Sequence, residues 1–128
     1  MAQPPAIEAF TATAGKLSDD VGLVAVTGEL DLYAAPRLEA AIQSASDTDG
    51  AVVVVDLSGT SFIDSTALGV LLAHVRRLAA RGGRLVLVSN DPRTVRLLEV
   101  TGVDRRLPLR STVKEALDEL AEHGGEAA

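Results

Sequence analysis

The sequence predicts a single α/β domain with a mainly parallel or mixed sheet of four to five strands and about four helices. Three observations predict this class. A chain of 128 residues suits one hydrophobic core. Apolar residues make up 47% of the chain and aromatic residues only 2%, so the core is aliphatic. Short β-branched runs alternate with stretches of helical periodicity, which is typical of strand–helix units with right-handed crossovers.

The first half of the chain contains three expected strands and one expected helix. Residues 7–13 are an edge-strand candidate, and the apolar run VGLVAVT at 21–27 is expected to be a buried strand. Apolar residues recur at helical spacing over residues 35–46, where Pro36 suits the first turn. The β-branched run AVVVVDL at 51–57 is too short for a buried helix and predicts a central strand covered on both faces.

The next segment alternates in the same way. Residues 58–64 are expected to form a loop, after which an apolar stripe marks a long helix that ends at Gly82 and Gly83. RLVLVS at 84–89 predicts a strand. A cap and a first-turn proline at 91–92 then begin a short helix.

The chain ends with a short strand and a helix. Residues 107–109 are expected to be the last strand, and Thr112 with Glu115 forms a capping box ahead of a final amphipathic helix. Together these elements predict a flexible lead-in, one domain and a flexible tail. The expected boundaries are 1–6, 7–122 and 123–128.

Charge and composition exclude several classes of function. The net charge of −6 repels nucleic-acid backbones, and the chain lacks the aromatic platforms that single-stranded nucleic acids stack on. The N-terminus has no signal-peptide pattern, and no apolar run is long enough to span a membrane. The absence of cysteine fits a reducing compartment, so we expect a cytoplasmic protein with no membrane partner.

Three polar residues stand where strands meet helices. Ser65 follows Asp64 at the start of the long helix, so its hydroxyl is either a helix cap or an acceptor for chemistry. Asp31 and Asp64 are each a turn or cap residue or part of a site.

His74 and His123 have no nucleophile or ligand-spaced partner nearby and are expected to face solvent.

Two motifs together resemble a known family. The segment FIDSTALGVL at 62–71 resembles the phosphorylation loop of STAS-domain anti-sigma factor antagonists. GELD at 28–31 resembles the second signature of that family, and RLLEVTG at 96–102 falls in the matching order. The resemblance covers residues 6–120, and it implies the STAS fold.

The resemblance also implies a function. In this family the unphosphorylated protein binds an anti-sigma factor that is also a serine kinase, which frees a sigma factor. Phosphorylation, here expected at Ser65, breaks that complex, and a serine phosphatase reverses it. The chain itself is expected to be no enzyme, with no cofactor and no metal. The residues expected to contact the partner are Asp31, Asp64, Thr66, Ala67, Leu68 and Gly69.

The sequence departs from the family pattern at two positions. Ala67 stands where many members have glycine, which stiffens the expected phosphorylation loop. Ala34 stands where serine or threonine is common, which removes a hydroxyl near the expected interface.

Three other functions are alternatives. The same fold could serve as a subunit of a sensory assembly or as a small-ligand-binding module. Asp56 ends the central strand, so a receiver-like site with Mg²⁺ held by Asp31, Asp56 and Asp64 is a further alternative. Against this alternative, the receiver pattern requires an acidic pair after its first strand and a lysine late in the sheet, and the only lysines of the chain are Lys16 and Lys114.

Overall fold

The structure is a computed structural model that describes residues 10–126, with all side chains in that range except those of Ser61 and residues 121–126. Its elements follow the order expected from the sequence. They are β1 (Thr11–Lys16), β2 (Val21–Leu30), α1 (Ala35–Ala45), β3 (Val52–Ile63), α2 (Ser65–Ala80), β4 (Arg84–Val88), α3 (Pro92–Thr101), a 3-10 turn (Val103–Arg105), β5 (Leu109–Arg110) and α4 (Val113–Glu126). Within the described part of the chain, no helix combines the length and the hydropathy needed to cross a bilayer.

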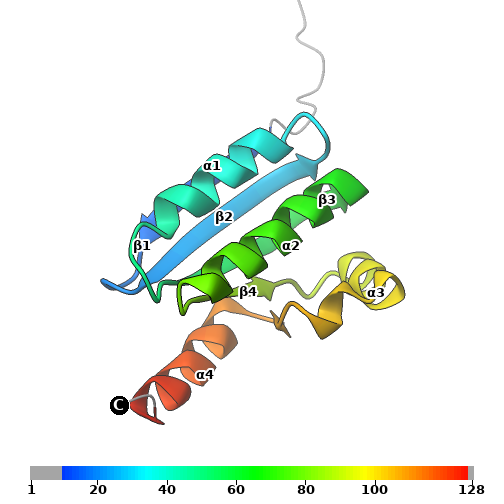
Figure 1. Ribbon diagram of the computed structural model, residues 1–128. Coiled ribbons are helices and arrows are strands. Elements are labelled where there is room, and N and C mark those ends of the chain that lie inside the picture. The colour runs from blue at the N-terminus through cyan, green and yellow to red at the C-terminus, as the bar shows by residue number, and fades with distance from the viewer. Residues whose placement is uncertain (1–9, 127–128) are drawn as a thin grey trace, which may run out of the picture.

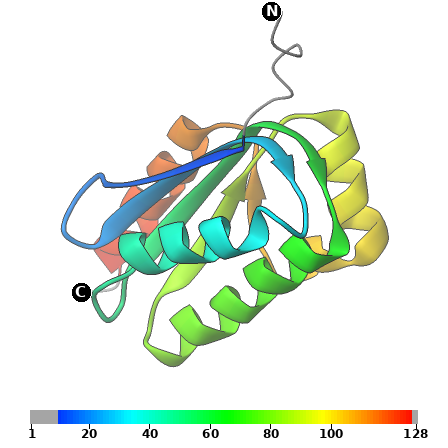
Figure 2. The same cartoon turned by 90° about the horizontal axis from the view of Figure 1, so that it is seen from above.

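The five strands form one mixed sheet in the order β1-β2-β3-β4-β5. β1 pairs antiparallel with β2, and the remaining neighbours are parallel. Helices α1 and α2 run side by side over one face, and α4 covers the other (Figures 1 and 2). The predicted α/β class and the mixed five-stranded sheet are therefore confirmed.

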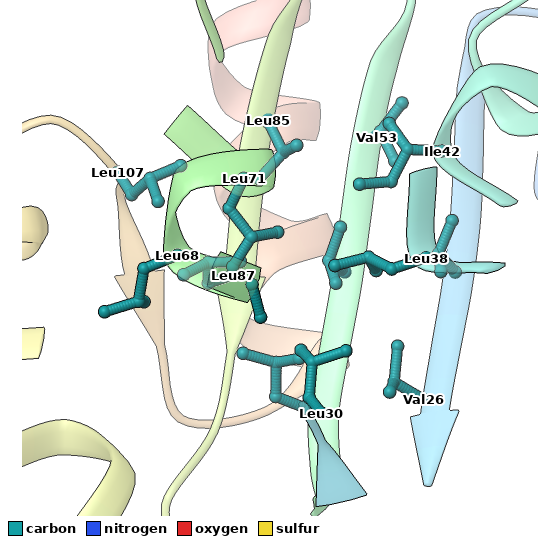
Figure 3. Close-up of a cluster of buried hydrophobic side chains, with 14 of the residues drawn as sticks. Val26, Leu30, Leu38, Ile42, Val53, Leu68, Leu71, Leu85, Leu87 and Leu107 are labelled. Atoms are coloured by element: carbon teal, nitrogen blue, oxygen red, sulfur yellow. The ribbon is translucent and has the colours of Figure 1, made fainter. Parts of the chain in front are cut away.

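The main core lies between the sheet and the helices α1, α2 and α3. Leu38 and Ile42 of α1 and Leu71 of α2 are fully buried against the sheet, as Figure 3 shows. A smaller cluster on the opposite face joins Val54 and Val86 to Ala116 of α4. Aliphatic side chains thus form a core on each face of the sheet. The apolar stripes of α1 and α2 pack both helices against the same face.

β3 is longer than expected. The polar residues 58–63, expected as part of a loop, continue the strand and pair with the end of β2. Two irregularities in the ladder insert extra residues into β3, and Gly28 takes a φ of 88° in β2 between them. The expected loop is wrong because β2 supplies the hydrogen bonds that the local sequence does not predict.

The ends of other elements also shift. β1 covers Thr11–Lys16, so only part of the expected strand at 7–13 is observed, and residues 7–9 lie outside the described range. α4 continues to Glu126, which places residues 123–126 of the expected tail in a helix.

His74 is buried, so its expected exposure to solvent is wrong. It lies in α2 between Leu71 and Leu78, and only 4% of the residue is exposed. The Nε of Arg77 donates a hydrogen bond to His74 Nδ1 at 3.1 Å, which requires an unprotonated Nδ1. Arg77 also donates to Ser46 Oγ next to the end of α1. The pair thus links α2 to α1. The side chain of His123 lies outside the described ones.

The burial of His74 predicts a pH-dependent stability. Burial, with the nearby charge of Arg77, lowers the pKa of His74 below its usual value of 6.5, although Glu39 opposes this shift. The unfolded chain therefore binds the proton more readily than the folded one. We expect the free energy of unfolding to fall as the pH drops below 6.5 and to level off below the folded-state pKa.

Urea unfolding at several pH values, followed by circular dichroism, measures this effect. His74→Gln, which cannot take up a proton, is expected to show a shallower slope between pH 5 and 7. Equal slopes for the two proteins would show that His74 does not carry the effect.

Candidate functional site

The ends of β2 and β3 bring the two sequence motifs together. Leu30 is paired with Ile63, and the Asp64 N–H donates to the Leu30 carbonyl at 3.1 Å. GELD therefore ends beside the start of α2. The two expected loops meet at one edge of the sheet, as parallel strands dictate.

Asp31 forms the turn that leads into α1. Its Oδ1 accepts hydrogen bonds from the N–H groups of Tyr33 and Ala34, both at 3.0 Å. Its backbone carbonyl also accepts from Ala34 and Ala35. Asp31 thus holds residues 32–34 in one conformation. Ala34 is the N-cap of α1 and is buried, so the alanine at this position changes no exposed surface of the domain.

Asp64 is the N-cap of α2, and Ser65 is the first helical residue. The Asp64 Oδ1 accepts from the Ala67 N–H at 3.0 Å. Ser65 is exposed, and its hydroxyl makes no hydrogen bond within the described part of the chain. The cap role therefore belongs to Asp64, which leaves the Ser65 hydroxyl open to solvent at a helix N-terminus.

The remaining predicted contact residues separate by burial. Thr66 and Gly69 are exposed on α2, whereas Ala67 and Leu68 point into the core. Ala67 is fully buried in the first turn of the helix, so it stiffens no flexible loop. The expectation that the side chains of Ala67 and Leu68 contact a partner is wrong, because both are covered by this domain itself.

Substitution of Asp64 separates its role as a cap from its charge. Asp64→Ala removes the bond to the Ala67 N–H and is expected to lower the free energy of unfolding by about 1 kcal/mol. Asp64→Asn keeps an oxygen acceptor and is expected to change it by only about 0.3 kcal/mol through the lost charge at the helix terminus. Urea unfolding of both variants measures the difference. Equal losses would assign the effect to the charge.

A groove and exposed apolar side chains beside Ser65 were missed in the sequence. The groove, of about 330 Å³, runs between α1 and α2, and Leu32, Val70 and Thr66 are among the residues that line it. Tyr33 is 86% exposed, and Leu32 and Phe62 are also exposed. The chain has only three Phe and Tyr residues; Phe62 begins the FIDSTALGVL segment, and Tyr33 follows the GELD motif by two residues. That placement was the available signal.

The acidic residues form no receiver-like cluster. Asp56 lies within β3 beside Ala25 and Val88, and its Oδ1 accepts from the Ser58 N–H at 2.9 Å. Lys16 pairs with Asp47, and Lys114 pairs with Asp118. Among the described residues, no three His, Cys, Asp or Glu side chains are grouped to hold a metal ion.

Comparison with known proteins agrees with this geometry. The family model of the STAS domain matches residues 15–116. The anti-sigma-B factor antagonist of Listeria monocytogenes is 34% identical over 90 residues, which is 70% of this chain and 79% of that protein.

Two solved structures share the fold. An anti-sigma factor antagonist from Mycobacterium paratuberculosis has a TM-score of 0.77 at 33% identity, covering 88% of this chain and 95% of that one. The anti-sigma factor antagonist SpoIIAA in its unphosphorylated form has a TM-score of 0.72 at 22% identity, covering 88% of this chain and 97% of that one. The chain therefore belongs to the STAS-domain family that includes the anti-sigma factor antagonists.

Proposed function

We propose that the protein is an anti-sigma factor antagonist that acts in the cytoplasm. Its unphosphorylated form binds an anti-sigma factor with serine kinase activity and thereby releases a sigma factor. Phosphorylation of Ser65 ends this binding, and a serine phosphatase restores it. The names of the related proteins support the antagonist role. The kinase and phosphatase chemistry is assigned to these partners and not to this chain.

One observation carries the proposal: the Ser65 hydroxyl is exposed without a hydrogen bond among the described residues, at the edge of the sheet where large apolar side chains are also exposed. Ser65 is exposed at the start of α2, and Thr66 lines the groove together with Leu32. Leu32, Tyr33 and Phe62 expose apolar surface at the same edge of the sheet. Exposed apolar and aromatic side chains of this kind anchor protein interfaces. We call these three residues with Ser65 the switch surface.

A phosphate at Ser65 would act on this surface and not on the fold. The N-terminus of α2 favours a negative charge, so the helix tolerates the modification. An approaching partner would have to desolvate about −1.5 to −2 charges against apolar side chains and beside Asp64. The desolvation free energy therefore weakens the complex and does not destabilise the fold.

Gly69 supports a partner that approaches α2 closely. It lies one turn after Ser65 on the exposed side of the helix, and an added Cβ would have no neighbour within 4 Å. Glycine in a helix interior costs about 0.5–1 kcal/mol relative to alanine. Nothing within the described fold requires it at this position. We infer that the partner backbone or side chains occupy the space that a larger residue would fill.

Substitutions at Gly69 test the proposal through opposite effects on two measurements. Gly69→Ala is expected to raise the free energy of unfolding by about 0.5–1 kcal/mol. Gly69→Gln, also a good helix former, is expected to weaken binding to the anti-sigma factor about tenfold, as measured by calorimetry.

Gly15→Ala is the matched control, because a Cβ there also has no neighbour within 4 Å and Gly15 lies in β1 away from the switch surface. It is expected to leave binding unchanged. Full binding by Gly69→Gln would contradict the proposed position of the partner on α2.

A further inference from the structure

A second pocket lies between α2 and the turn that follows α3. Its volume is about 310 Å³. The residues that line it are Leu72, Thr101, Gly102, Val103, Arg105 and Arg106. The backbone of the turn is fixed, because Arg105 N–H donates to the Gly102 carbonyl and Arg106 N–H donates to the Val103 carbonyl. We call it the diarginine pocket.

The guanidinium groups of this pocket are free, unlike most others in the protein. Neither Arg105 nor Arg106 makes a side-chain hydrogen bond or ion pair within the described residues. The arginines whose side chains pair with other groups of the protein are Arg37, Arg77, Arg81, Arg84, Arg93 and Arg110. Arg105 and Arg106 are consecutive in the chain and line one hollow, and their unpaired guanidinium groups leave N–H donors available to an external acceptor.

The chemistry of the lining selects a class of ligand. Two guanidinium groups match a doubly charged oxyanion, and arginine binds phosphate with paired N–H donors. Leu72 is half-buried and Val103 buried, so they add apolar surface to the same hollow. The volume is at the lower end of small-molecule pockets, and the net charge of −6 opposes a polyanion.

We propose that the diarginine pocket binds the phosphate group of a small organic phosphate monoester. This inference goes beyond the proposed function and does not depend on phosphorylation of Ser65. Leu72 follows Ser65 by seven residues, which is about two turns along the same side of α2. A ligand in the pocket therefore lies at the border of the helix face that Ser65 and Gly69 share.

Titration of the ¹⁵N-labelled protein, followed by NMR, tests the pocket. The probes are ribose 5-phosphate, inorganic phosphate and ribose. We expect saturable shifts of the Gly102 and Val103 amides and of the arginine Nε–H groups with ribose 5-phosphate. Inorganic phosphate is expected to bind more weakly, because it lacks the sugar that would contact Leu72 and Val103, and ribose alone is expected to cause no shift.

Variants distinguish specific binding in the diarginine pocket from nonspecific attraction of the phosphate to exposed arginines. Arg105→Gln and Arg106→Gln are each expected to weaken ribose 5-phosphate binding about tenfold. Arg96→Gln is the matched control, since Arg96 is an exposed, unpaired arginine of α3 that does not line the pocket.

The control is expected to change the affinity less than twofold. The absence of saturable shifts would overturn the proposal, and so would an equal loss of affinity in Arg96→Gln. Inorganic phosphate that binds as tightly as ribose 5-phosphate would overturn the assignment to an organic ester.

Discussion

Ser65→Asp is expected to weaken binding to the anti-sigma factor about a hundredfold, which corresponds to a loss of roughly 3 kcal/mol. The carboxylate places a permanent charge at the first residue of α2, beside Asp64 and the exposed apolar side chains. The same charge favours the helix N-terminus, so the fold is expected to keep or gain stability. Calorimetry of the complex and urea unfolding of the free protein measure the two effects.

Two further variants isolate the charge. Ser65→Asn has the shape of the aspartate without its charge and is expected to bind within about threefold of the unmodified protein. Ser65→Ala is expected to stay bound whether or not ATP is present. If Ser65→Asp and Ser65→Asn bind equally well, charge at this position does not drive the switch.

Gly83→Ala is expected to destabilise the protein by about 3 kcal/mol, the largest effect on folding that we expect from an added methyl group. A Cβ at Gly83 would lie 2.2 Å from the carbonyl oxygen of Ala51, at the start of β3. That same oxygen accepts the Arg84 N–H, and Gly83 N–H donates to the Leu78 carbonyl. The methyl group therefore forces apart the junction that holds the end of α2 to the sheet.

Circular dichroism during heating measures this change, which is expected to lower the Tm by roughly 10 °C. Gly15→Ala is again the control, since it adds the same methyl group in open space. A Tm for Gly83→Ala equal to that of the control would show that the junction relaxes without cost.

The fold was predictable where one signal decided each element. The run at 51–57 could only be a buried strand, and it became the centre of the sheet as part of β3. Leu38 and Ile42 recur at helical spacing and are both fully buried in α1. In these segments the local pattern and the tertiary packing agree, which is why periodicity alone was sufficient.

The extension of β3 could not be predicted from its own residues. Residues 58–61 are serine, threonine or glycine, and in isolation such residues favour a turn. Their strand conformation comes from β2, whose end pairs with Gly59 to Ile63 across the irregular register. The position of Ser65 depends on this extension, because it brings α2 level with the turn formed by Asp31.

His74 shows an error of a different kind. The apolar stripe of α2 includes Leu71 and Leu78, and position 74 falls between them on the same side of the helix. The periodicity therefore placed His74 inside, but the polarity of its side chain favoured solvent. The bond from Arg77 satisfies the ring nitrogen that burial would otherwise leave unpaired. That pairing depends on the three-dimensional structure.

Mapping the phosphorylated residue tests the proposed switch at Ser65 most directly. The protein is incubated with its cognate anti-sigma factor kinase and ATP, and the product is mapped by mass spectrometry. We predict a single phosphate on Ser65, loss of the complex upon its addition, and no phosphate on Ser65→Ala. A phosphate on another residue such as Thr66, or an unmodified protein after incubation with a kinase to which it binds, would contradict the account.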